Sequence, residues 1–294
     1  MVASGLVVGF LTGGFPAYSK EISQLALAVG MGFSLSEITV KGISPRAELR
    51  GFLVSFALSY VLLSGVILAF AYASDEAAIR DGWVLMAAVP PAVAVVPITA
   101  YLRGDTRRAL VSLALLYVLG LALVPLITLA FTTQSVPISE ILLQTILLIG
   151  LPLIASRAIA RWPRGRENRA TVVSVSFFVL VTAIAGSTRG ALLARPDLLG
   201  VLSLLALLRT FGVGGLVFLV ARARGASRET RLSLTAFASF KNLGLTVVLA
   251  FAVFGPTATL PSILSLVFEI AWLAALPFLF RRSDPAHPIV GEHA

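Results

Sequence analysis

Three ionisable residues lie inside long apolar stretches of the sequence: Arg209, Lys241 and Glu269. A charged side chain near the centre of a bilayer costs at least about 2.5–3.5 kcal/mol, so these residues are functional candidates if the chain crosses a membrane. Two cations and one anion leave a net positive charge, which would attract a carboxylate or another anion. In the alternative interpretation, Glu269 pairs with Lys241 or with Arg209, and the pair only neutralises buried charge.

Residues that interrupt helices lie in two of the apolar stretches. Residues 89–99 contain three prolines and a threonine, and residues 237–245 contain a serine, a lysine, an asparagine and a glycine. Proline removes a backbone donor, and non-helical backbone inside a membrane persists only when it is buried in protein or lines a cavity. The alternative is a pair of ordinary proline-kinked helices. We predict a substrate or coupling site containing Lys241, Asn242, Ser239, Thr99, Glu269 and Arg209, with helix breaks at Pro90, Pro91, Pro97 and Gly244.

The residues needed for several other kinds of chemistry are absent from these stretches. The sequence has no cysteine, and both histidines, His287 and His293, lie in a polar tail. No metal site, cofactor or enzymatic activity is therefore expected. The net charge of +9 does not indicate nucleic acid binding, because 17 of the 23 Lys and Arg residues fall in alternate loops, which is typical of membrane topology.

Membrane-spanning helices are the elements that must position the candidate residues. Hydrophobic residues make up 58% of the chain, charged residues 13%, and the mean hydropathy is +0.96. This composition predicts an all-α polytopic membrane protein in a lipid bilayer, which a helix crosses with about 20 apolar residues. Ten transmembrane segments are predicted, at residues 2–17, 22–39, 50–73, 82–102, 109–132, 139–160, 170–192, 198–221, 232–254 and 258–280.

The positive loops predict the orientation of the ten segments. Five clusters hold 17 Lys and Arg residues on one side, against four residues on the other. Positive loops are usually cytoplasmic, so we expect a multi-pass protein of the cell membrane with both termini in the cytoplasm. The polar tail, residues 283–294, is predicted to be disordered.

The ten segments divide into two sets of five around the uncharged stretch at residues 132–137. Because five is odd, a second copy of the first set would insert upside down. This arrangement indicates an inverted repeat, with one unit at residues 1–132 and the other at 138–282. Many secondary transporters are built in this way.

The two interrupted stretches resemble parts of the bile acid:sodium symporter family. The first runs from Pro90 to Asp105 and ends Tyr-Leu-Arg-Gly-Asp, and the second runs from Asn242-Leu-Gly-Leu to Phe254-Gly255. The resemblance, which extends to a superfamily with arsenite and auxin-type efflux carriers, implies a panel domain and a core domain. It also implies that broken helices four and nine cross near the membrane midplane, and that the cargo is an organic anion.

The chain departs from this family where sodium-coupled members supply oxygen ligands. Sodium needs a shell of oxygens and no neighbouring ammonium. The family's sodium positions align with Val95, Val96, Ala109, Leu113, Phe237 and Lys241, although a one-residue slip would bring in Ser112. We therefore predict a sodium-independent transporter of a small organic anion, monomeric or homodimeric, in which Lys241 replaces the sodium site. The alternatives are a sodium- or proton-coupled symporter of the same fold, or a channel or ligand-sensing membrane module.

Overall fold

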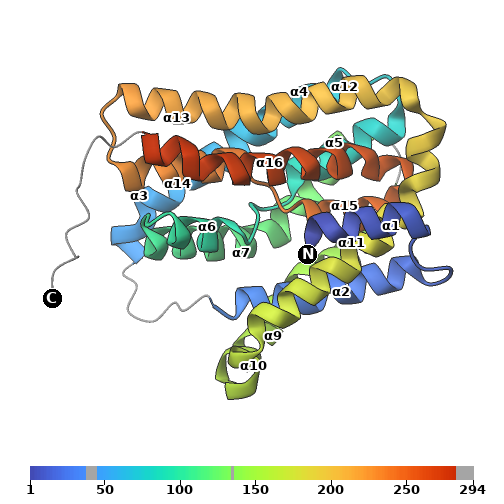
Figure 1. Ribbon diagram of the computed structural model, residues 1–294, viewed down its shortest axis with the longest axis horizontal. Coiled ribbons are helices and arrows are strands. Elements are labelled where there is room, and N and C mark those ends of the chain that lie inside the picture. The colour runs from blue at the N-terminus through green and yellow to red at the C-terminus, as the bar shows by residue number, and fades with distance from the viewer. Residues whose placement is uncertain (38–44, 134–135, 283–294) are drawn as a thin grey trace, which may run out of the picture.

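The computed structural model describes residues 1–37, 45–133 and 136–282, which fold into helices joined by short connections (Figure 1). These residues contain one isolated β-bridge, between Pro91 and Lys241, and no longer strand. The tail predicted to be disordered, residues 283–294, lies outside the described residues. So do residues 38 and 39 of the predicted second segment.

Six helices within the described part of the chain are long and apolar enough to cross a membrane. They are Glu48–Tyr72, Thr106–Phe131, Ile138–Arg161, Arg169–Ala194, Pro196–Ala223 and Thr257–Phe280. Each coincides with a predicted segment to within a few residues. Large hydrophobic side chains such as Leu126, Ile154 and Phe278 are exposed on them, as expected for helices that face lipid. The helical structure therefore fits a polytopic membrane protein.

Three of these long helices contain a π-helical segment near the middle, where each N–H bonds to the carbonyl five residues earlier. The first consists of α3 (Pro45–Phe56), η1 (Ala57–Leu63) and α4 (Ser64–Tyr72). The second consists of α8 (Ile138–Thr145), η2 (Ile146–Gly150) and α9 (Leu151–Arg161), and the third of α12 (Pro196–Leu207), η3 (Leu208–Gly212) and α13 (Val213–Ala223). The others are α7 (Thr106–Phe131), α11 (Arg169–Ala194) and α16 (Leu260–Arg282), which follows the 3-10 helix η4 (Thr257–Thr259).

The four remaining predicted segments are shorter helices or pairs of helices. They correspond to α1 (Val2–Thr12), α2 (Ser19–Leu35), the pair α5 (Ala77–Ala88) and α6 (Val95–Tyr101), and the pair α14 (Arg228–Ser239) and α15 (Leu243–Phe254). The first is shorter than the predicted residues 2–17, because Gly13 and Gly14 have φ angles of +85° and +75° and end the helix. A short helix, α10 (Pro163–Glu167), joins α9 to α11.

The helices pack in two groups. In one group α11 lies against α1 and α2, and α2 lies against α9. In the other, α5 lies against α4, α7 and α16, α13 lies against α14, and α12 lies against α16. The groups meet where α15 contacts α2 and α11, and where α16 contacts α11. The contact between α15 and α2 includes a hydrogen bond of 3.1 Å from Lys20 Nζ to the carbonyl of Ala252.

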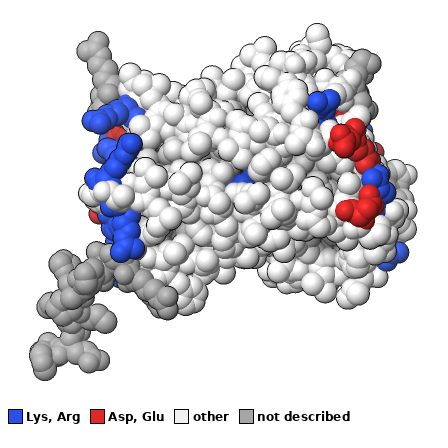
Figure 2. Space-filling model, turned by 90° about the horizontal axis from the view of Figure 1, so that it is seen from above, with Lys and Arg blue, Asp and Glu red and all other residues white. Residues whose placement is uncertain are grey.

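The charged side chains lie at the two ends of the long axis (Figure 2). Lys and Arg predominate at one end, Asp and Glu lie mainly at the other together with further Lys and Arg, and the band between the ends is almost free of charge on the face shown. The long helices in Figure 1 run along the same axis. This distribution indicates a protein embedded in a membrane, with its two charged ends in water.

Candidate functional site

Two interruptions of helices lie side by side inside the protein. Residues 89–94 separate α5 from α6, and residues 240–242 separate α14 from α15. Ala92 N–H donates to the carbonyl of Phe240 at 3.3 Å, and Asn242 N–H donates to the carbonyl of Pro90 at 3.0 Å. These two bonds form the bridge between Pro91 and Lys241. The backbone of each interruption therefore satisfies part of the other.

The local sequence explains where the four helices end and begin. Pro90 and Pro91 have no N–H to continue α5. Asn242 begins α15, because its Oδ1 accepts from the N–H of Leu245 at 3.0 Å, as an N-cap does. Pro97 and Gly244, which were predicted as break residues, lie in the first turns of α6 and α15, where helices tolerate proline and glycine better than in their interiors.

Lys241 is fully buried, and its ammonium group is bound by the end of α5. Lys241 Nζ donates to the carbonyls of Ala87 at 3.1 Å and Val89 at 2.9 Å. It also lies 4.3 Å from the centre of the Tyr60 ring, close enough for a cation–π interaction. Two carbonyls and an aromatic face therefore surround the three N–H donors.

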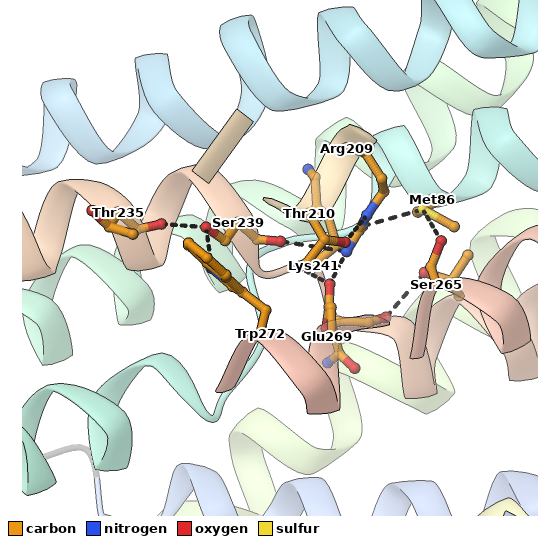
Figure 3. A network of polar contacts seen from close by, with 11 residues as sticks. Met86, Arg209, Thr210, Thr235, Ser239, Lys241, Ser265, Glu269 and Trp272 are labelled. Carbon is orange, nitrogen blue, oxygen red and sulfur yellow. Dashed lines mark hydrogen bonds and ion pairs between the residues drawn. The ribbon is translucent and has the colours of Figure 1, made fainter. Parts of the chain in front are cut away.

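Glu269 of α16 forms its ion pair with Arg209, which η3 brings into the interior (Figure 3). Arg209 Nη2 donates to Glu269 Oε1, and the same Oε1 accepts from the backbone N–H of Lys241 at 3.1 Å. The interpretation in which Glu269 pairs with the Lys241 side chain is therefore wrong for this structure. The side chain of Lys241 is directed to the end of α5, and only its backbone reaches the carboxylate among the contacts described.

Three further predicted site residues use their side chains for local structure. Besides its capping bond, Asn242 donates from Nδ2 to the hydroxyl of Tyr117 at 2.7 Å. Ser239 Oγ donates to the carbonyl of Thr235 at 2.7 Å and accepts from Trp272 Nε1 at 3.0 Å. The hydroxyl of Thr99 donates to the carbonyl of Val95 in its own helix, at 2.7 Å. The polar atoms of these three side chains are therefore satisfied within the protein, and the bonds of Ser239 and Thr99 go to the carbonyl four residues earlier in their own helices.

A cavity of about 490 Å³ lies beside the two interruptions. Residues 92–94 and 240–244 form one wall, α11 forms another with residues such as Val173 and Phe177, and α16 contributes residues such as Leu273. Lys241, Asn242, Gly244, Glu269 and Pro97 line this cavity. The structure does not place Arg209, Ser239, Thr99, Pro90 or Pro91 in its lining.

An ion pair with partly exposed side chains lies at the rim of the cavity, next to the first turn of α11. Glu37, which follows α2, pairs with Arg169, the first residue of α11, and both line the cavity. Most other lining side chains are apolar. A ligand of this cavity would therefore meet charge at the rim and polar backbone at the interruptions, with apolar contacts between them.

The positions aligned with sodium ligands are packed in the core. Val95, Val96, Ala109, Leu113 and Phe237 are all buried in one hydrophobic cluster. Ser112 is buried as well, on the neighbouring position of α7. The apolar side chains supply no oxygen at these places.

Several residues of the site were not identified from the sequence. Tyr60, Tyr117 and Met86 contact Lys241, Asn242 and Arg209 respectively. The pair formed by Glu37 and Arg169 was also missed. Tyrosine near the middle of a predicted membrane span was the available signal for the first two, whereas Met86 resembles any other apolar residue in the sequence.

A protein-family model matches most of the chain. The profile of the SBF-like CPA transporter family, which is similar to the bile acid:sodium symporters, matches residues 17–282. This match confirms the resemblance inferred from the two interrupted stretches. No curated protein matches the chain.

Proposed function

The chain belongs to the SBF-like CPA transporter family, and from this premise we propose that it carries a small organic anion across the membrane by alternating access. The observation that carries the proposal is the cavity beside the two interrupted helices. Its lining includes Asn242, Leu243 and Gly244, the N-cap and first two residues of α15. Helix N-termini carry partial positive charge, and in transporters with broken helices they face anionic groups of the substrate.

The buried side chains add to this preference for an anion. Arg209 and Lys241 carry two positive charges in their ionised forms, and Glu269 carries one negative charge. The sum is positive, and the low polarity of the surroundings strengthens its attraction for an anion. Phe177 and Leu273 in the cavity walls fit a cargo with an apolar body.

We also propose that transport does not require sodium, because Lys241 acts as a cation that is built into the chain. Its ammonium binds two backbone carbonyls at the end of α5, where a dissolved cation would otherwise find oxygen ligands. The apolar residues at the other aligned positions support the same proposal. A fixed ammonium in this place is unfavourable for a dissolved sodium ion at the same carbonyls.

The arrangement of the helices supports the proposed inverted repeat of ten segments. The third and eighth predicted segments both contain a π-helical segment, η1 and η3, and the fourth and ninth are both divided in two. These features occur at corresponding positions of the two sets of five, whereas η2 in the sixth segment has no counterpart in the first. We propose that the helices around α5, α6, α14 and α15 form the core domain, and that α1, α2, α9 and α11 belong to the panel domain.

We propose that the structure represents the conformation open to the cytoplasm. The charged residues at the rim of the cavity, Glu37 and Arg169, lie in the end of the molecule with the predicted cytoplasmic loops. Lys20, near the start of α2, binds the carbonyl of Ala252 near the end of α15. That contact joins the two groups of helices on the opposite side, where the path would be closed.

Transport by purified protein in liposomes tests these proposals. We expect saturable counterflow of a labelled small carboxylate, found by screening a panel, at the same rate in sodium and in choline buffer. Flux that rises linearly without saturation would indicate a channel. Uptake that rises steeply with sodium would contradict the proposed role of Lys241, and the lack of transport of every organic anion tested would contradict the proposed cargo.

A further inference from the structure

Both interrupted helices end in the middle of the protein with backbone carbonyls that their own helix cannot satisfy. α5 ends at Ala88, and α14 ends at Ser239. The last four carbonyls of a helix have no partner within it, and the C-terminal end carries about half a negative charge. Away from water, such an end requires a hydrogen-bond donor, and a cation suits it best.

A side-chain cation is bound at each of these two ends. Lys241 Nζ binds the carbonyls of Ala87 and Val89 at the end of α5. Arg209 Nη2 lies 3.3 Å from the carbonyl of Ser239, the last residue of α14. Like Lys241, Arg209 is fully buried. The two ends therefore have the same type of partner, although the two cations come from different elements.

The other contacts of Arg209 connect the elements around the two interruptions. Its Nη1 lies 3.3 Å from the sulfur of Met86 in α5, and its Nε lies 3.1 Å from the hydroxyl of Thr210. Through Nη2 it reaches both α14 and Glu269 of α16 (Figure 3). Glu269 in turn accepts from the backbone N–H of Lys241. One guanidinium group thus contacts three helices next to both interruptions.

We propose that Arg209 is a second built-in cation, which neutralises the end of α14 as Lys241 neutralises the end of α5. The contact between the two interruptions is then held together by two tethered cations and requires no dissolved ion at either helix end. Arg209 does not line the cavity, so it acts as a positioning residue for the interruption and for Glu269. This inference deepens the proposed function and rests on it for the transport measurements.

The simplest competing explanation is that Arg209 only balances the charge of Glu269. That explanation accounts for one of its contacts but not for the bond to the carbonyl of Ser239. It also gives no reason for the position of Lys241, whose ammonium contacts carbonyls rather than the carboxylate. The two explanations differ in what they predict when both members of the ion pair are made neutral.

Chemical rescue tests the proposal. Arg209→Ala is purified, and its thermal unfolding in detergent and its counterflow in liposomes are measured with millimolar guanidinium, methylammonium or sodium chloride. We expect counterflow to fall by about tenfold or more, because the interruption loses its charged hydrogen-bond donor inside the protein. Guanidinium should restore both stability and counterflow, and the other salts should not. The matched variant Lys241→Ala should respond to methylammonium and not to guanidinium.

Two further variants separate the explanations. Arg209→Lys should keep most of the stability, and the double variant Arg209→Met with Glu269→Gln should remain destabilised because the end of α14 still lacks a cation. Stability of the double variant equal to the unmodified protein would overturn the proposal, as would the lack of any response of Arg209→Ala to guanidinium. If Arg209→Ala does not fold, the yield of folded Arg209→Lys against Arg209→Met gives the answer: equal yields overturn the proposal, and a higher yield with lysine supports it.

The stability measurements are independent of the cargo. A protein that carries no organic anion but regains stability with guanidinium would contradict the proposed function and still support the second built-in cation. A protein that exchanges organic anions but is equally stable with lysine, methionine or arginine at position 209 would support the proposed function and contradict the second built-in cation.

Discussion

At the scale of single residues, Lys241 is bound by groups that suit an ammonium ion. Two carbonyl oxygens and the face of the Tyr60 ring surround Nζ. A lysine in an apolar interior is expensive, and these partners replace the water that it loses. Its position therefore combines a structural bond to the end of α5 with a positive charge next to the proposed cargo site.

Lys241→Gln is expected to abolish exchange of organic anions in ordinary buffer. The substitution removes the charge and leaves two carbonyls with a weaker donor, while it restores an oxygen that sodium could use. We expect counterflow to fall by about tenfold or more. The measurement is counterflow in liposomes with and without sodium. Arg224→Gln, which removes an exposed cation after α13 that does not line the cavity, serves as the comparison, and full activity in Lys241→Gln would refute this role.

Tyr60 offers a separate test of the cation–π interaction. Its hydroxyl forms no hydrogen bond with the described residues. Tyr60→Phe therefore keeps the aromatic ring beside Lys241 Nζ and should change stability little. Tyr60→Leu removes the aromatic face and should lower the free energy of unfolding by about 1–2 kcal/mol. The difference in melting temperature between the two variants measures the effect. Equal melting temperatures in Tyr60→Phe and Tyr60→Leu would show that the ring does not stabilise the ammonium.

The sequence predicted which ionisable residues are buried but not how they are paired. Counting residues along apolar stretches places Arg209, Lys241 and Glu269 at similar depth. The direction of each side chain depends on the additional residue that η3 adds to a helical turn and on the backbone conformation of residues 240–242. Neither can be predicted from the spacing of residues along the sequence. For this reason the pair with Arg209 was one of two alternatives, and the contact of Lys241 with α5 was not foreseen.

At the scale of elements, the packing of α13 on α14 depends on one glycine. A side chain at Gly214 would overlap Ser239 Oγ and press on the Trp272 ring, whereas a side chain at the neighbouring Gly215 would meet nothing within 4 Å. Gly214→Ala should therefore lower the free energy of unfolding by about 1–3 kcal/mol, as overpacking usually does. Gly215→Ala is the matched control and should be neutral or slightly stabilising. Thermal unfolding of both variants tests the prediction, which equal stabilities would contradict.

The helix interruptions were easier to predict from the sequence than the π-helical segments. Pro90 and Pro91 remove backbone donors, and Asn242 can cap a helix, so both places carry a local signal. Among the π-helical segments, η2 is followed by Pro152, but η1 and η3 have no comparable marker. An additional residue in a helical turn is stabilised by tertiary contacts, which a single sequence does not reveal.

At the scale of the whole molecule, the distribution of positive charge gives a testable topology. We expect both termini and the loop containing Arg166 in the cytoplasm, and Arg195 on the opposite side. Because the chain has no cysteine, single substitutions such as Arg166→Cys and Arg195→Cys can be labelled with a membrane-impermeant thiol reagent in intact cells. Arg195→Cys should react before the cells are opened and Arg166→Cys only afterwards. The reverse result would invert the proposed orientation of the cavity.

In the proposed carrier, the covalent attachment of the Lys241 ammonium would determine which step of the transport cycle senses voltage. A carrier whose cation cannot leave is positively charged when empty and electroneutral when it holds a monovalent anion. The membrane potential, worth about 2.3 kcal/mol per charge per 100 mV, would then act on the return of the empty carrier and not on the loaded one. Exchange of one anion for another would be insensitive to voltage, whereas net flux in one direction would follow it.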